Sequence, residues 1–345
     1  GMAKAYEIVK KDKEAMECYA KIRDSYPASP QCPEAMLRTA VLMLRSNPMS
    51  KEAEDILVRL EKEYRTSRDV HGNALFYLSY IEFTRGNSAK SAEGFRKIVS
   101  DNLCDARLSF SAKQYLLWSI ASSGAFTQES DMLFSYLSAN EDRMLAANPD
   151  MLLFLGSRFV EAGRHDDAIA CYQAVAKNSS TDYRIKALTG LGMAYEGKNE
   201  VPKAIRFYRE AEKIIPENKD VYSELLSRLG MALARKGDRN EAVLVFEKCI
   251  DLAASRNASA RARLGLAEIL AANPDDINRA NRYAMSVFIL SDDPDLTSRA
   301  MILSVELSLR QKNIEEAKAT FDELKKRFPD LLKDEKVRKL SEKLR

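Results

Sequence analysis

Two stretches of this chain, LTGLGMAYEGKN (188–199) and LSRLGMALARKGD (226–238), place a glycine between leucine and methionine. These glycines, Gly192 and Gly230, belong to a series with Gly156 and Gly265, at spacings of 36, 38 and 35 residues. A glycine inside a helix costs about 1 kcal/mol relative to alanine. Four of them at a nearly constant period indicate a shared structural reason. Close packing of helices, repeated along a solenoid, is the simplest one.

A second pattern follows the first three glycines. A small residue and then an aromatic residue stand four positions apart, in the pairs Ala168/Tyr172, Ala204/Tyr208 and Ala242/Phe246. This spacing places both side chains on one helical face, so the small residue can admit a neighbouring helix while the ring fills the groove beside it. Glycines between the two patterns, such as Gly163 and Gly237, predict short turns. Each repeat is therefore expected to be a helix, a turn and a second helix.

These residues resemble the pattern of the tetratricopeptide-repeat family. In segment 185–218 the matching residues are Leu188, Leu191, Gly192, Tyr195, Ala204, Tyr208, Ala211 and Pro216. Segments 149–182, 223–256 and 298–331 match less completely. The resemblance implies an all-α, right-handed superhelical solenoid of stacked antiparallel helix hairpins with a C-terminal capping helix. It implies an architecture and not an activity.

We expect a single solenoid over residues 1–345. Its predicted parts are a partial first repeat (1–31), degenerate repeats (32–143), the best-matching repeats (149–256), further degenerate repeats (257–330) and a capping helix (331–345). In the last part Val337, Leu340 and Leu344 fall on one face of an amphipathic helix. The short first helix and the Gly1-Met2 start lead us to expect a fragment of a longer protein.

Composition argues against several classes of function. The 54 basic and 51 acidic residues give a net charge of +3, which argues against a nucleic-acid-binding surface. No apolar run is long enough to span a membrane. The five cysteines are odd in number and include no closely paired motif, so we expect buried or incidental thiols. A Cys18–Cys32 bridge is the one pairing left open, for an oxidising compartment.

The search for catalytic chemistry gives no candidate. The chain has two histidines, His71 and His165, which are too few for a histidine-rich metal site. His165 precedes Asp166 and Asp167, and this trio is predicted to open a helix, where acidic residues suit the positive end of the helix dipole. No phosphate-binding glycine motif and no nucleophile motif occurs. We therefore predict no enzymatic activity, no catalytic residue, no cofactor and no metal.

The family resemblance also implies which residues face the concave groove. These are the positions three before and one after each repeat glycine, or the residue that replaces it (Ser79 and Leu117), in the first helix of each hairpin. In this chain they are Phe76, Tyr80, Gln114, Trp118, Leu153, Ser157, Thr189, Met193, Ser227, Met231, Ala262 and Leu266. Aromatic and methionine side chains are frequent anchors for partners. The alternative for Phe76, Tyr80 and Trp118 is a place in the core between helices.

The expected function is a non-catalytic scaffold that binds another protein or a peptide on its concave surface. The alternatives are a module for a small ligand or glycan, and a recruiting or regulatory domain of a larger protein; self-association is left open. Tyr26-Pro27-Ala28-Ser29-Pro30, followed by Glu34-Ala35, resembles repeats in bacterial cell-envelope proteins of the outer-membrane assembly lipoprotein and Tol-associated periplasmic types. That resemblance implies a bacterial envelope or periplasmic location in preference to the cytoplasm.

Overall fold

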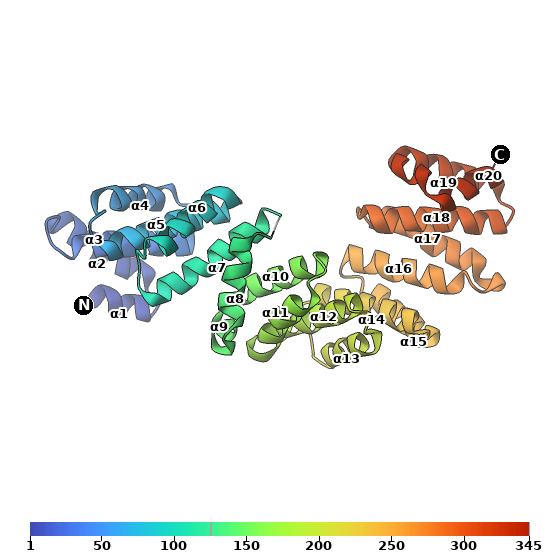
Figure 1. Ribbon diagram of the computed structural model, residues 1–345, viewed down its shortest axis with the longest axis horizontal. Helices are drawn as coiled ribbons and strands as arrows, with labels where there is room; N and C mark the ends of the chain where they lie inside the picture. Colours follow the sequence, from blue (N-terminus) through green and yellow to red (C-terminus); the bar gives the residue numbers. More distant parts are fainter. Residues whose placement is uncertain (125, 345) are drawn as a thin grey trace. The chain divides into compact units, whose positions relative to one another are not determined.

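The computed structural model describes residues 1–124 and 126–344, which form helices and connecting turns (Figure 1). No strand occurs within these residues. The chain divides into two compact units, unit 1 (Gly1–Met151) and unit 2 (Leu152–Arg345). The boundary falls inside helix α10 (Pro149–Glu161).

Unit 1 consists of helix hairpins joined by short turns. Its helices before the boundary are α1 (Met2–Ile8), α2 (Asp12–Ser25), α3 (Cys32–Ser46), α4 (Lys51–Glu63), α5 (Arg68–Thr84), α6 (Ser88–Ser100), α7 (Ala106–Ser122), α8 (Gln128–Ser138) and α9 (Glu141–Ala146). The short α9 was not expected from the repeat pattern. It is preceded by Asn140, whose side chain caps the helix by accepting a hydrogen bond from the Arg143 N–H.

Unit 2 continues the same design. After α10 its elements are α11 (His165–Asn178), α12 (Thr181–Gly197), α13 (Val201–Glu212), α14 (Lys219–Lys236), α15 (Arg239–Leu252), α16 (Arg256–Leu270), the 3₁₀ turn η1 (Pro274–Asp276), α17 (Ile277–Leu290), α18 (Pro294–Arg310), α19 (Ile314–Arg327), the 3₁₀ turn η2 (Pro329–Lys333) and α20 (Glu335–Lys343). The start of α11 at His165, with Asp166 and Asp167 in its first turn, agrees with the predicted helix opening.

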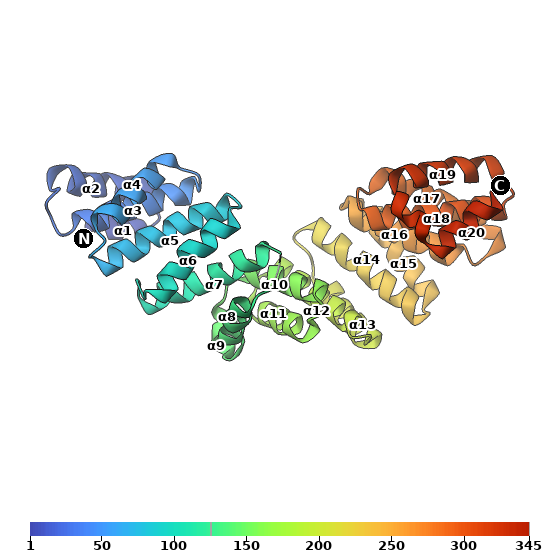
Figure 2. The ribbon, with the colours of Figure 1, turned by 45° about the horizontal axis from the view of Figure 1, so that its top comes forward.

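Helices that follow one another in the sequence pack together as hairpins, as α12 with α13 and α14 with α15 (Figures 1 and 2). The first helices of consecutive hairpins also touch. In unit 1, α3 contacts α5 and α5 contacts α7, and in unit 2, α12 contacts α14 and α14 contacts α16. Each hairpin therefore buries its apolar face against its neighbours in the chain, as in other repeat proteins. The predicted all-α solenoid is confirmed.

The repeat glycines allow this packing. A Cβ atom at Gly192 would overlap the ring of Tyr208, and one at Gly230 would overlap the ring of Phe246. Gly156 stands in the same relation to Tyr172, whose Cζ would lie 2.6 Å from the added Cβ. The aromatic residue of each hairpin thus rests on the glycine of the preceding helix. The periodic cost of glycine in a helix is offset by the burial of a whole ring.

Two of these rings contact a second glycine from the next hairpin. Tyr172 also packs against Gly190 of α12, and Phe246 also packs against Gly265 of α16. Both rings are almost fully buried. In these two places one side chain holds two consecutive hairpins together.

The C-terminal segment covers the end of the stack, as predicted. Val337, Leu340 and Leu344 are buried in one apolar cluster with Phe321 and Leu324 of α19. The predicted continuous helix is instead divided, since η2 ends at Lys333 and α20 begins after Asp334. Asp334 caps α20 by accepting hydrogen bonds from the backbone N–H groups of Lys336 and Val337.

Candidate partner-binding site

A pocket of about 380 Å³ lies in unit 2 where the first helices of three consecutive hairpins meet. α10, α12 and α14 supply most of its wall, and α11 supplies Tyr172. The lining residues are Leu153, Ser157, Tyr172, Lys186, Thr189, Gly190, Met193, Asp220, Val221 and Glu224. Most of the accessible lining is apolar. We call it the unit 2 pocket.

The ring of Tyr172 and the bare backbone of Gly190 shape one wall of the unit 2 pocket. A side chain at position 190 would overlap that ring. Burial raises the pKa of the Tyr172 phenol, and the neighbouring Cys171 side chain raises it further. The phenol therefore stays protonated at neutral pH and can donate or accept a hydrogen bond.

Thr189 carries an unpaired polar group in the pocket wall. Its side chain is only 6% exposed, and Oγ1 has no hydrogen-bond partner. A helical threonine can donate to the carbonyl four residues earlier, as Thr39 does to the Ala35 oxygen at 2.9 Å. A buried hydroxyl without a partner costs about 1–3 kcal/mol. The Thr189 hydroxyl therefore destabilises the wall in the chain alone.

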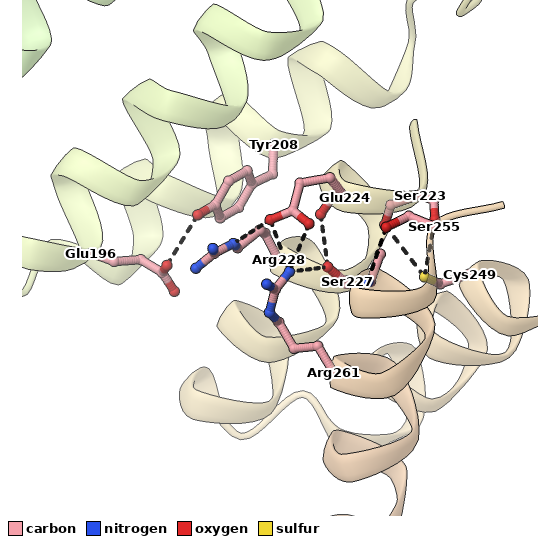
Figure 3. A network of polar contacts seen from close by, with 10 residues as sticks. Glu196, Tyr208, Ser223, Glu224, Ser227, Arg228, Cys249, Ser255 and Arg261 are labelled. Atoms are coloured by element: carbon pink, nitrogen blue, oxygen red, sulfur yellow. Dashed lines mark hydrogen bonds and ion pairs between the residues drawn. The ribbon is translucent and has the colours of Figure 1, made fainter. Parts of the chain in front are cut away.

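The rim of the unit 2 pocket carries both signs of charge. Lys186 and Asp220 are exposed, and neither forms an ion pair within the described part of the chain. Glu224 is held by Arg261 at 2.8 Å and by Arg228 at 2.9 Å (Figure 3). Burial raises the pKa of Glu224, but the two guanidinium groups outweigh burial, so the pKa lies below its usual range.

The network around Glu224 fixes α14 against α16. Arg261 of α16 donates to both carboxylate oxygens of Glu224 and, at 2.8 Å, to the Ser227 hydroxyl (Figure 3). Ser227 in turn donates to the Glu224 backbone oxygen. The carboxylate at the edge of the pocket is therefore positioned by two helices and is not a mobile surface charge.

Four predicted groove residues meet in the unit 2 pocket: Leu153, Ser157, Thr189 and Met193. The other predicted positions of unit 2 do not line it. Ser227, Ala262 and Leu266 are fully buried, and Met231 is half-buried. In the chain alone the first three of these contribute to packing between helices. The binding role of all these positions stays a prediction.

The predicted positions of unit 1 lie within or beside an aromatic cluster. Phe76 is 6% exposed and packs edge-on against Phe95 and Tyr115, so it belongs to the core. Tyr80 and Trp118 are half-buried, and the Trp118 ring stacks on Tyr115 at a centroid distance of 6.1 Å.

Gln114 and Trp118 line a smaller pocket of about 210 Å³ in unit 1, together with Ser111, Tyr115, Ala146, Asn148 and Met151. The side-chain oxygen of Gln114 accepts a hydrogen bond from the Asn148 N–H at 2.8 Å. The side-chain oxygen of Gln114 in this pocket is thus already paired within the chain.

The groove prediction missed six residues of the unit 2 pocket: Tyr172, Lys186, Gly190, Asp220, Val221 and Glu224. Lys186 and Glu224 both stand six positions before the repeat glycine of their helix. They continue the face of the predicted residues toward the start of each helix, at spacings of three and four. That continuation was the signal available in the sequence.

Other chemistry is sparse in the part of the chain that the structure covers. Residues 1–124 and 126–344 contain no group of three histidine, cysteine or acidic side chains arranged to hold a metal ion. All five cysteines are free thiols, and Cys32 is buried while Cys18 is partly exposed. Among the described helices, none has the length and apolarity needed to cross a bilayer.

Comparison with known proteins gives a consistent family. Residues 145–219, 223–256 and 300–331 each match the family described as tetratricopeptide repeat. Most of the matched residues lie in the segments where the glycine and aromatic pattern is strongest. The matches do not bear on the resemblance to bacterial cell-envelope repeats, which stays a prediction.

One solved structure in particular is similar in fold to this chain. The apo form of the quorum sensor NprR from B. thuringiensis has a TM-score of 0.58 and 10% identity, over 94% of this chain and 96% of that one. The Cut9–Hcn1 heterotetramer of the APC/C gives 0.48 and 14%, over 99% and 74%. The P58(IPK) TPR domain gives 0.30 and 15%, over 99% and 95%. The matched segments of this all-α solenoid, residues 145–219, 223–256 and 300–331, are thus tetratricopeptide repeats.

Proposed function

We propose that this chain is a non-catalytic interaction scaffold, and that the unit 2 pocket holds an apolar side chain of a peptide segment from a partner protein. The supporting observation is the convergence of Leu153, Ser157, Thr189 and Met193 on one pocket. These residues come from two hairpins, and α14 of a third hairpin completes the wall.

The chemistry of the pocket suits noncovalent capture. Its apolar wall removes an inserted side chain from water, which stabilises a complex by about 25 cal/mol per Å² of apolar surface. Met193 has an unbranched, flexible side chain that can adjust to the shape of the occupant. Lys186, Asp220 and the fixed carboxylate of Glu224 stand at the rim, where they can select the orientation of a peptide.

A peptide selection tests the proposal. Peptides are selected from a random dodecamer phage library on the full chain, synthesised with a fluorescent label and measured by fluorescence anisotropy. We expect Met193→Glu to weaken binding at least about tenfold, since it places a charge in an apolar wall. Met285→Glu is the matched control, because Met285 is an exposed methionine of α17 in the same unit.

Two results would contradict the proposal. One is a set of selected peptides whose affinity is the same for Met193→Glu and for the unchanged chain. The other is a set that loses affinity equally with the Met285→Glu control. Urea denaturation of each variant verifies that a loss of binding does not come from a loss of folding.

A further inference from the structure

Another pocket of unit 1, distinct from the smaller one lined by Gln114 and Trp118, combines an apolar floor with uncompensated positive charge. Its volume is about 580 Å³ and its accessible lining is largely apolar. It lies between α6, α7 and α8, which pack in sequence. The lining residues are Arg96, Val99, Ser100, Lys113, Leu116, Gln128, Glu129, Met132, Leu133 and Tyr136. We call it the unit 1 pocket.

The unit 1 pocket is separate from the predicted groove residues. Lys113 and Leu116 line it from α7, whereas Gln114 and Trp118 of the same helix line the smaller pocket. At 3.6 residues per turn these two pairs point to opposite sides of α7. A partner here would therefore use a surface that groove binding leaves unused.

Two cations share one aromatic ring at the edge of this pocket. The Lys113 Nζ lies 4.0 Å from the ring centroid of Tyr136, and the Arg143 guanidinium carbon lies 4.1 Å from it. The two charges are thus no more than about 8 Å apart, within the screening length of physiological salt. Arg143 is held in place by donating to the Tyr136 backbone oxygen at 3.0 Å.

No carboxylate of residues 1–124 or 126–344 forms an ion pair with Lys113 or Arg143. The acidic side chain in the lining, Glu129, is already bound by Arg96 through two hydrogen bonds of 2.8 Å. The charges of Arg96 and Glu129 neutralise each other, so the positive charges of Lys113 and Arg143 remain unpaired. Two like charges held close together favour an added anion.

The apolar part of the pocket is exposed as well. Met132, from α8, has 68% of its surface accessible, which is unusual for a large apolar side chain. Leu133 and Leu116 add further apolar lining to the same pocket. The ligand therefore has to offer a bulky apolar group and negative charge within a short distance.

We propose that the unit 1 pocket docks an acidic segment of a partner protein, with one bulky apolar side chain inserted beside Met132 and flanking carboxylates paired with Lys113 and Arg143. An anionic membrane is the less suitable occupant. Attachment to anionic lipid uses clusters of about four to eight basic residues, and here two charges are uncompensated. The concave apolar floor fits one inserted side chain better than a flat headgroup layer.

The test uses a positional array of labelled nonapeptides and the full chain. The centre of each peptide is leucine, phenylalanine or serine, and the flanks are glutamate, lysine or serine. We expect anisotropy to detect binding only when an apolar centre is combined with glutamate flanks, and binding to weaken as salt increases. Lys113→Glu with Arg143→Glu should weaken it at least about tenfold and should increase the affinity for lysine-flanked peptides.

The matched control is Lys318→Glu with Lys326→Glu, which changes the net charge equally on the exposed surface of α19. This variant should bind the glutamate-flanked peptides as the unchanged chain does. Met132→Glu should remove the preference for an apolar centre. Circular dichroism and urea denaturation verify that all variants are folded.

Three outcomes overturn the proposal. The first is the absence of binding of every glutamate-flanked peptide at about 1 mM. The second is equal loss in the control variant. The third is binding to phosphatidylglycerol vesicles, lost with Lys113→Glu and Arg143→Glu, without selective peptide binding. None of these results depends on Met193, so the proposal for the unit 2 pocket is tested separately.

Discussion

The backbone of Gly192 lies against the ring of Tyr208 and leaves no room between them for a Cβ atom. Tyr208 is fully buried, and its hydroxyl donates to Glu196 at 3.0 Å, one turn beyond Gly192 on α12. The contact therefore combines backbone, ring and hydrogen bond within one hairpin, and it explains why the period of the chain is carried by glycine.

Gly192→Ala should destabilise unit 2 by about 1–3 kcal/mol, because the added methyl group must displace a buried ring. The ring is the cause, so the same change should cost less when Tyr208 is replaced by leucine. A urea-denaturation cycle of Gly192→Ala, Tyr208→Leu and the double variant measures this coupling, expected at about 0.5–3 kcal/mol. Additive single changes would show that the ring is not what excludes the methyl group.

Thr189→Val should stabilise the chain by up to about 1 kcal/mol, since it replaces an unpaired buried hydroxyl with a methyl group of the same shape. The matched control is Thr39→Val. It removes a hydroxyl that donates to the Ala35 oxygen, and it should destabilise by about 0.5–1.5 kcal/mol. The midpoints of urea denaturation of the two variants, each compared with that of the unchanged chain, give the sign of each stability change. A shift of the same sign in both would mean that the Thr189 hydroxyl is satisfied in solution.

Acid should weaken the contact between α14 and α16. The folded-state pKa of Glu224 lies below the ordinary 4.5, so its contribution to stability is present above that pH and is lost as the pH falls through the folded-state value. Glu224→Gln should cost about 1–2 kcal/mol at neutral pH, between an exposed and a buried ion pair. It should also flatten the decline of stability in acid.

The control for the Glu224 prediction is Glu217→Gln, because Glu217 is exposed and precedes the same helix. Urea denaturation at pH 7 and at pH 3 to 4 compares the two variants with the unchanged chain. The network is unimportant for stability if both variants show the acid dependence of the original protein.

Thiol labelling should separate Cys18 from the buried cysteines. Burial raises the pKa of the Cys249 thiol to about 11, and it also raises the pKa of Cys171. Few thiolates form at these two positions near neutral pH, and access is blocked as well. Maleimide at pH 7.5 should modify Cys18 first and the buried thiols only after unfolding. Cys18→Ser should remove the fast phase in mass spectrometry, and a fast phase that persists would locate an exposed thiol elsewhere.

The fold could be predicted from the sequence because its determinants are local and periodic. Gly192 and Tyr208 stand in one hairpin, so their spacing is visible in a single sequence. The contact of Gly190 with Tyr172 was not predicted, because it joins two hairpins and depends on how closely α12 approaches α11. Val337 and Leu340 show the favourable case, where an amphipathic pattern alone predicted a buried face.

The unit 2 pocket was only partly predictable. Thr189 and Met193 follow from a fixed offset to Gly192, and both line the pocket. The same offset on α14 leads to Ser227, which is buried beneath Arg261, while Glu224 takes the place at the rim. The offset assumes that every first helix exposes the same turn. Adjacent helices that cross at an angle expose different turns along their length.

The double glycine contacts have a consequence for shortening the chain. Phe246 packs onto glycines of both α14 and α16, so cutting between α15 and α16 would expose an aromatic ring to water. Tyr208 contacts a glycine only within its own hairpin, and its hydroxyl is also satisfied there. A truncation that ends after α13 should therefore stay more soluble than one that ends after α15, whose last ring would favour aggregation.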